Sequence, residues 1–188
     1  MDLMPTIDKY IMTSIRVCEL EDLIVDTERK IVRTTIRRDI AYSNGQVKTM
    51  DSLDETLRFY YKTKENAYKE LNDIARVQDQ TSRTYINASS EMSKTELKEL
   101  IQSLQKKFHT NEKRKKELVG RRNRAIIKST ESNFSKDETN IYIQISISCF
   151  SEIKRIDAMQ LHYIEVINNL NQILNNSKRL ELISPKNN

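Results

Sequence analysis

The chain has 188 residues and a formal net charge of +5, and 31% of its residues are charged against 37% hydrophobic. It contains only two Gly and two Pro, which excludes a fold built on many tight turns, whereas such a composition suits long helices that each bury a narrow stripe. We therefore predict an all-α coiled coil: an elongated antiparallel bundle of three long helices, with four as the alternative. This single domain is expected to occupy residues 1–180, with a disordered polar tail at 181–188.

The first predicted helix covers residues 7–42. Apolar side chains recur there at intervals of three and four from Ile7 to Ile40, the spacing of an amphipathic helix. Thr6 is expected to cap its start. Residues 43–45, Ser-Asn-Gly, are expected to end it, because Asn and Gly accept the left-handed conformation that closes helices.

The second predicted helix covers residues 51–91. Ser52 and Glu55 have the spacing of a capping box at its start. Apolar residues then follow alternating steps of four and three, the pattern of a coiled coil. Polar side chains interrupt this series, so we expect it to pack inside an antiparallel bundle rather than as a self-sufficient zipper; they are Lys64, Gln78 and Thr81.

A turn is predicted at residues 87–93, which are small and polar, because Ser93 and Glu96 form a second capping box there. One helix running through this stretch is the alternative. Helical periodicity then continues through the most basic part of the chain, residues 106–128.

A third capping box, Ser135 with Glu138, allows a further break, so residues 94–180 form either one kinked helix or two. Residues 141–150 alternate between apolar and polar side chains as a strand does. No second strand of comparable quality is present to pair with them, and we therefore assign this stretch to a helix.

Residues 106–128 contain ten Lys and Arg against two Glu, a local net charge of +8. On a helical wheel with about 100° per residue and Leu104 at zero, four apolar side chains lie within about 60° of Leu104: Phe108, Leu118, Val119 and Ile126. The basic side chains at roughly 180° to 260° are Lys106, Lys113, Arg121, Arg124 and Lys128. The sequence thus predicts a basic stripe opposite an apolar face, suited to binding a polyanion. Lys115 and Arg122 fall on the apolar side, where we expect their stems to lie along apolar surface or their charges to meet a carboxylate.

The sequence offers no pattern for catalysis. Cys18 and Cys149 stand alone and are expected to be reduced core thiols, and His109 and His162 have no metal-ligand partner at the right spacing. No phosphate-binding loop, nucleophile elbow or zinc-protease motif is present. We therefore expect no enzyme activity, metal or cofactor.

No signal peptide is expected at the N-terminus. The longest uncharged run, residues 139–151, is too short to span a bilayer. We therefore expect a cytoplasmic protein whose membrane contact is peripheral.

Two segments carry a resemblance to a known family. The run Phe150-Ser-Glu-Ile-Lys-Arg-Ile-Asp157, continued by Leu161 and Tyr163, resembles the last helix of sorting-nexin BAR domains, which commonly has Phe, then Lys four and Asp seven positions later. Residues 57–65, LRFYYKTKE, are similar to the opening of that domain's second helix. Residues 93–130 correspond to the distal arm, and the resemblance covers roughly residues 7–176.

The resemblance implies three long antiparallel helices, at about 7–42, 51–91 and a kinked 94–180, that dimerise and place a basic face on anionic, curved membranes. It implies a role in endosomal sorting or vesicle trafficking, as a homodimer or a heterodimer with another BAR protein, peripheral on the endosomal membrane. The implied membrane-binding residues are Lys106, Lys107, Lys113, Arg114, Lys116, Arg121, Arg124 and Lys128. The implied core or dimer residues are Leu57, Tyr60, Leu71, Phe150, Ile153 and Tyr163. We expect no PX domain ahead of this region, and the resemblance then implies weak lipid selectivity and dependence on a PX-bearing partner.

Two other interpretations stay open. The chain is alternatively a coiled-coil subunit of a tethering or cytoskeletal complex, whose basic stripe is a solvated face or binds an acidic partner. Nucleic-acid binding is the third and least favoured, because Phe108 is the only aromatic residue in the basic segment and no zipper follows it.

Overall fold

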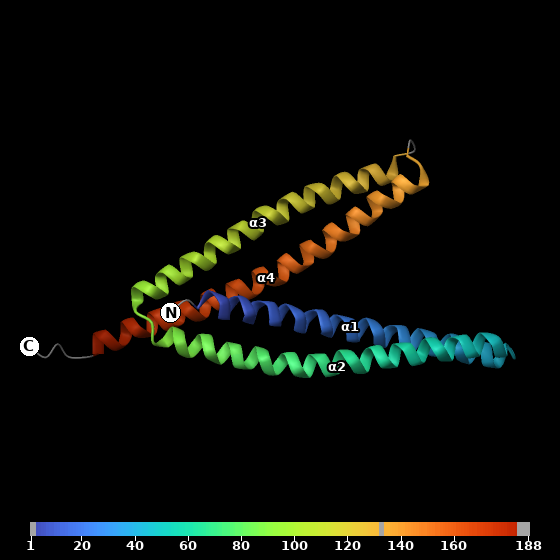
Figure 1. Cartoon of the computed structure of the whole chain (residues 1–188), viewed down its shortest axis with the longest axis horizontal. Coiled ribbons are helices and arrows are strands. Elements are labelled where there is room, and N and C mark those ends of the chain that lie inside the picture. Colours follow the sequence, from blue (N-terminus) through green and yellow to red (C-terminus); the bar gives the residue numbers. More distant parts are fainter. Residues whose placement is uncertain (1–2, 132–133, 184–188) are drawn as a thin grey trace, which may run out of the picture. The chain divides into compact units, whose positions relative to one another are not determined.

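The computed structural model describes residues 3–131 and 134–183 of the chain. These residues form four helices, α1 (Met4–Ser43), α2 (Val47–Ser90), α3 (Lys94–Thr130) and α4 (Lys136–Ile183), as Figure 1 shows. The shortest has 37 residues and the longest 48, so each is about 55 to 70 Å long at 1.5 Å per residue. The all-α prediction is confirmed for this part of the chain, including the assignment of residues 141–150 to a helix.

The described residues follow the four-helix alternative rather than one kinked helix over 94–180. Helix α3 ends at Thr130, and the next residue, Glu131, has an extended backbone (φ −75°, ψ 129°). Helix α4 begins at Lys136 and runs to Ile183, so residues 181–183 are helical and the remainder of the predicted tail lies outside the described residues.

The predicted stop after α1 is confirmed. Gly45 has a left-handed backbone (φ +68°). The N–H of Gln46 donates to the Ala41 carbonyl (2.9 Å) and that of Gly45 to the Tyr42 carbonyl (3.0 Å). These two hydrogen bonds make a Schellman motif, which satisfies the last carbonyls of the helix.

Two predicted helix starts are wrong. Helix α1 begins at Met4, so Thr6 lies within its first turn instead of capping it. Helix α2 begins at Val47, and Ser52 lies inside it. The tight turn at Gly45 explains the second error, because helical bonding resumes at once: the Met50 N–H already donates to the Gln46 carbonyl (3.1 Å).

The other two capping boxes form as predicted. At the start of α3, the Glu96 N–H donates to Ser93 Oγ (3.3 Å) and the Ser93 N–H donates to Glu96 Oε2 (2.8 Å). Ser135 and Glu138 make the same exchange before α4, at 3.3 and 2.9 Å. These hydrogen bonds favour the ionised carboxylates and hold the pKa values of both glutamates below their ordinary value. A turn therefore separates α2 from α3 at residues 91–93, whereas residues 87–90 of the predicted turn still belong to α2.

The described chain divides into two compact units. In the first, residues 12–81, α1 and α2 run antiparallel (Figure 1). Leu20, Ile24 and Ala67 are buried, and Leu71 and Ile74 pack against them. Leu57 is also buried, whereas Tyr60 and Leu71 are half-buried. These three predicted core residues therefore lie in or beside the interior of this unit.

The polar interruptions of the α2 series have partners. Gln78 Nε2 donates to Ser14 Oγ (2.8 Å), and Lys64 Nζ lies 2.7 Å from Glu28 Oε1. Thr81 Oγ1 donates to a carbonyl of its own helix. These hydrogen bonds and this ion pair explain how a heptad series with polar members packs inside an antiparallel pair of helices.

The predicted apolar stripe of α1 is wrong at its C-terminal end. Ile36 and Ile40 are exposed, while Thr34 and Ala41 are buried in their place. The buried side of α1 continues the three-and-four spacing from Leu20 and Ile24 through Thr27. That spacing, rather than hydrophobicity, decides which residues face α2.

The second unit comprises residues 3–11 with 82–131 and 134–183. In it α3 and α4 form an antiparallel pair (Figure 1). The first residues of α1 and the last of α2 belong to the same unit and pack at one end of this pair. Tyr85 is fully buried there, with its ring 5.3 Å from that of Tyr10, and Asn169 Nδ2 donates to its hydroxyl (3.0 Å). Burial raises the pKa of Tyr85. The Tyr10 hydroxyl in turn donates to Glu165 Oε1 (2.9 Å).

Farther along α3 and α4, one buried cluster joins the two helices. It contains Leu118, Cys149, Ile153 and Ile156, with Ile145 packed against it. Within this unit α3 packs against α4 at this level, and most of its side chains from Lys113 to Lys128 are exposed.

Candidate functional site

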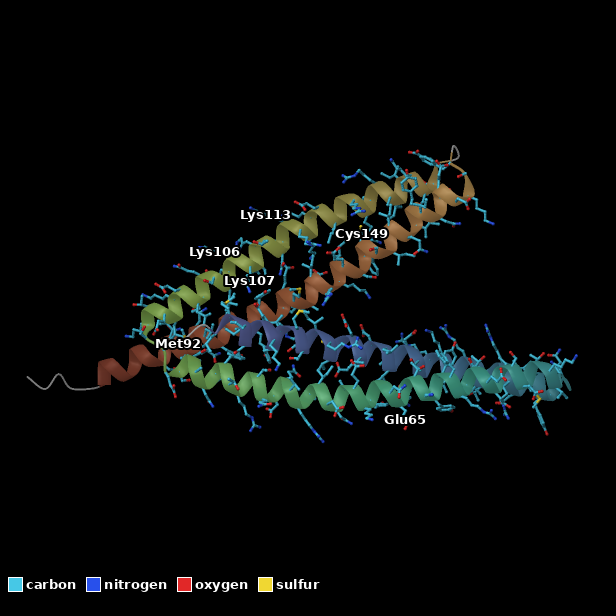
Figure 2. All side chains as sticks on the ribbon, in the orientation of Figure 1. Glu65, Met92, Lys106, Lys107, Lys113 and Cys149 are labelled. Atoms are coloured by element: carbon cyan, nitrogen blue, oxygen red, sulfur yellow. The ribbon has the colours of Figure 1, made fainter. Side chains whose placement is uncertain are left out.

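The basic stripe lies on the exposed side of α3. Leu104, Leu118 and Ala125 are buried and fix the rotation of the helix about its axis. Seven of the ten basic side chains between residues 106 and 128 are exposed: Lys106, Lys113, Arg114, Lys116, Arg121, Arg124 and Lys128. In Figure 2, Lys106 and Lys113 lie on the side of α3 away from α4, whereas Lys107 lies on the side that faces it.

The buried arc of α3 is narrower than predicted. Phe108 is half-buried, but Val119 and Ile126 are each 39% exposed. Both were expected on the apolar face with Leu118. The discrepancy arises because, within this unit, α3 packs against one helix, α4, at this level, and one neighbouring helix does not cover an arc of about 120°.

Three basic side chains make ion pairs within the chain. Lys107 Nζ lies 2.6 Å from Asp8 Oδ2 of α1. Arg114 Nε donates to Glu152 Oε1 of α4 (2.9 Å), and Lys115 pairs with Asp157 of α4. Lys107 and Arg114 were both predicted to bind the membrane, and their charges are already partly balanced. The expectation that Lys115 meets a carboxylate is confirmed.

Arg122 lies against an aromatic ring. Its guanidinium carbon is 4.8 Å from the ring centroid of Phe150, and Lys154 Nζ is 5.2 Å from the same centroid. Phe150 is 42% exposed, so this predicted core residue lies outside the single-chain core, unlike Ile153 and Tyr163, which are buried. The two cation–π contacts lie in the range of about 0.5–1 kcal/mol each that applies to exposed sites.

Five basic side chains of the stripe segment make neither an ion pair nor a cation–π contact with any residue in the described part of the chain. They are Lys106, Lys113, Lys116, Arg121 and Arg124, and we call them the unpaired cations. From Lys106 to Arg124 they extend over about 27 Å of helix at 1.5 Å per residue. One acidic residue, Glu117, lies at roughly 220° on the same wheel, within the stripe.

The charge is densest toward the C-terminal end of α3. A shallow hollow of about 150 Å³ is lined there by Arg121, Arg124 and Lys128 of α3 and by Tyr142 of α4. Lys128 Nζ lies 5.2 Å from the centroid of the Tyr142 ring. Guanidinium groups present several donors in a planar fork that fits phosphate oxygens. Sequence reasoning missed Tyr142, because its place beside α3 depends on the pairing of α3 with α4.

Gly120 lies in the middle of this surface. A Cβ atom there would be 3.6 Å from Nη1 of Arg124, an ordinary van der Waals distance. The guanidinium of Arg124 therefore lies back over Gly120, along the helix surface rather than extended from it.

The cysteines and histidines do not gather. Cys149 is buried as expected, but Cys18 is exposed, so its assignment to the core is wrong. His109 Nδ1 lies 2.7 Å from the Gln105 carbonyl, and His162 Nδ1 lies 3.2 Å from Glu165 Oε2. Among residues 3–131 and 134–183, no three His, Cys, Asp or Glu side chains are placed to hold a metal ion.

None of the helices in the described ranges has an apolar stretch long enough to cross a bilayer. Comparison with known proteins adds no relative: no family model, curated protein or solved structure matches the chain.

Proposed function

We propose that the chain is a non-catalytic, dimeric membrane-surface scaffold that binds anionic lipid headgroups through the basic stripe of α3. The observation that carries this proposal is the set of five unpaired cations on the exposed side of one helix. A disordered basic tail would bind the same charge, but it would lose conformational entropy on ordering. A stripe fixed on a helix is already arranged as a flat anionic surface requires.

The charge is sufficient for peripheral binding. Each basic residue near an anionic leaflet contributes about 1 kcal/mol, so the five unpaired cations contribute about 5 kcal/mol per chain. A dimer that presents two such stripes to one surface doubles this contribution. Lys107 and Arg114 contribute less, because Asp8 and Glu152 already balance them.

The hollow beside Tyr142 is the position at which we expect a single headgroup phosphate to bind first. Arg121 and Arg124 supply planar donors there and Lys128 supplies a third charge. The finer parts of the proposal come from the resemblance: a BAR-type bundle, binding to curved membranes, location on the cytoplasmic face of endosomes, and a PX-bearing partner for lipid selectivity.

The alternative function is a coiled-coil subunit of a tethering or cytoskeletal complex with no direct lipid contact. One observation favours it: α4 exposes large apolar side chains, among them Ile147 (53%) and Leu161 (68%). A partner protein on this surface would leave the stripe of α3 as a solvated face.

Co-sedimentation of the full chain with liposomes separates these functions. The vesicles are phosphatidylcholine alone or phosphatidylcholine with phosphatidylserine, each at two diameters. The test variant reverses three stripe charges, Lys113→Glu, Arg121→Glu and Arg124→Glu. A matched control reverses three exposed charges of α1, and its substitutions are Arg29→Glu, Arg33→Glu and Arg37→Glu.

The membrane proposal predicts binding to the anionic vesicles, loss of binding in the α3 variant and retention in the α1 control. Both variants change the net charge equally, so a difference between them locates the binding surface. Equal loss in both variants, or binding to neutral vesicles as strong as to anionic ones, contradicts the proposal. Absence of vesicle binding leaves the tethering function in its place, and preference for duplex DNA over anionic vesicles indicates nucleic-acid binding.

A further inference from the structure

Helix α4 has two series of side chains that follow alternating steps of four and three. The first is buried, with Ile167 half-buried within it, and its other members are Cys149, Ile153, Ile156, Gln160, Tyr163, Leu170 and Leu174. The second, which we call the outer series, contains Ile143, Ile147, Phe150, Lys154, Asp157, Leu161 and Ile164. Steps of four and three mark a surface that packs against another helix. The buried series has its partners within the chain, and the outer series is largely exposed.

The exposure of the outer series is large for apolar side chains. Ile143 is 41% exposed, Ile147 53%, Phe150 42%, Leu161 68% and Ile164 45%. From Ile143 to Ile164 the series extends over about 32 Å of helix at 1.5 Å per residue. Its exposed apolar side chains lie on both sides of the charged pair Lys154 and Asp157, and exposed apolar side chains gathered on one face mark an interaction site.

We propose that a second copy of this chain covers the outer series, with the two α4 helices antiparallel about a two-fold axis between residues 155 and 156. In this register Lys154 faces the partner's Asp157, and Phe150 faces the partner's Leu161. Ile147 likewise faces the partner's Ile164. From residue 147 to residue 164, each apolar side chain of the outer series then meets an apolar one and each charged side chain meets the opposite charge. Ile143, at the end of the series, faces the partner's Asn168.

The charges decide between the two possible orientations. A parallel, in-register pair would place Lys154 against the partner's Lys154 and Asp157 against the partner's Asp157. Like charges opposed at an interface disfavour that arrangement. The antiparallel pair turns the same two residues into two symmetric ion pairs. This self-complementarity points to a second copy of the chain, because a two-fold interface uses the same surface on both subunits.

Contacts within the chain leave the side chains of Lys154 and Asp157 accessible to a second copy. The Asp157 side chain is 45% exposed although it pairs with Lys115, and a carboxylate has two oxygens with which to accept from a second donor. Lys154 is exposed, and its Nζ lies 5.2 Å from the centroid of the Phe150 ring without an ion pair inside the described part of the chain. Half-buried Ala158 follows the central charged pair, and a small side chain there permits close approach of the two helices.

This inference deepens the proposed function and rests on it only for the existence of a dimer, since lipid plays no part in it. The outer series lies on α4 and the basic stripe on α3, so the two surfaces do not share residues. A contact between one helix of each copy, with a polar layer at its centre, is modest, and we expect a dissociation constant on the order of micromolar.

Sedimentation equilibrium of the full chain, without lipid, tests the inference. The unaltered chain is expected to be a dimer in reversible equilibrium with monomer. Lys154→Asp and Asp157→Lys are each expected to weaken dimerisation at least tenfold, because each opposes like charges across the axis. The double variant with both substitutions restores the ion pairs in reverse and is expected to recover dimerisation.

The double variant would not recover in a parallel arrangement, where like charges stay opposed. Arg155→Asp, an exposed neighbour outside the outer series, is the matched control and is expected to leave the dimer intact. Circular dichroism confirms that each variant keeps its helix content. A chain that stays monomeric at high concentration overturns the inference. So does a dimer whose dissociation constant is unchanged by both single substitutions.

The two proposals fail separately. A dimer with the expected charge response but no liposome binding overturns only the membrane function. Liposome binding that depends on the stripe in a monomeric chain overturns the α4 interface and the dimeric state, and leaves the membrane contact of the stripe standing.

Discussion

Leu118 and Val119 are neighbours in α3 with different surroundings, and replacing each by Ala tests the orientation of the stripe-bearing helix. Leu118 is 8% exposed and packs with Cys149, Ile153 and Ile156. Replacing a buried Leu with Ala costs about 2–5 kcal/mol. We expect the lower end, about 2–3 kcal/mol, because Leu118 also lines an open groove of about 450 Å³ into which water and neighbouring side chains can move.

Val119 is 39% exposed. Its two extra carbons would contribute about 1.6 kcal/mol if fully buried, so their partial burial contributes about 1 kcal/mol. The higher helix propensity of Ala offsets about 0.5 kcal/mol of this, which leaves about 0.5 kcal/mol. Val119→Ala should therefore destabilise the protein several-fold less in free energy than Leu118→Ala.

Urea unfolding followed by circular dichroism measures both free energies of unfolding at one protein concentration, so that any dimerisation contributes equally. The expected order is a clear loss for Leu118→Ala and a small one for Val119→Ala. Equal losses, or a larger loss for Val119→Ala, would refute the orientation of α3, and the assignment of the stripe to its exposed side would be wrong with it.

Further predictions concern the turns, the stripe and the caps. Gly120→Ala should raise the urea midpoint, because a helical Gly costs about 1 kcal/mol relative to Ala and the added Cβ meets only ordinary contacts. Gly45→Ala should reduce the free energy of unfolding by a similar amount, because φ is +68° there. A more stable Gly45→Ala protein would contradict the Schellman turn. Glu117→Gln should tighten binding to anionic vesicles about fivefold, from about 1 kcal/mol of removed repulsion, whereas unchanged affinity would place residue 117 outside the membrane contact. The capping glutamates Glu96 and Glu138 should titrate below the ordinary pKa of 4.5. Because their pKa is lower in the folded than in the unfolded protein, they stabilise the folded state fully above pH 4.5. This stabilisation disappears as the pH falls through the folded pKa. NMR titration of the two side chains checks this, and midpoints at or above 4.5 would be inconsistent with the capping boxes.

Local features of the fold could be predicted from the sequence, because the groups that make them are a few residues apart. Ser93 and Ser135 bond to glutamates three positions later, and Gly45 ends α1 through hydrogen bonds within six residues. The starts of α1 and α2 could not be placed in the same way. Thr6 and Ser52 have capping chemistry, but the helices had already begun before them.

Pairings between distant residues could not be predicted. Lys107 meets Asp8 across 99 positions of the chain, and nothing local distinguishes it from Lys106, which extends to solvent. The exposure of Val119 and Ile126 has a similar origin. Periodicity shows which side of a helix is apolar, but the width of the covered arc depends on how many helices pack there.

The central claim is that the stripe of α3 itself touches the membrane. An environment-sensitive fluorophore on Thr110→Cys tests this directly, because residue 110 is exposed at about 240° on the wheel, within the stripe. Ser151→Cys, exposed on α4, is the matched control, and both carry Cys18→Ser to remove the exposed native thiol. Quencher-bearing lipids in vesicles with phosphatidylserine should quench the label at residue 110 and leave the label at residue 151 unchanged. Equal quenching at both positions, or quenching at residue 151 alone, would contradict the claim.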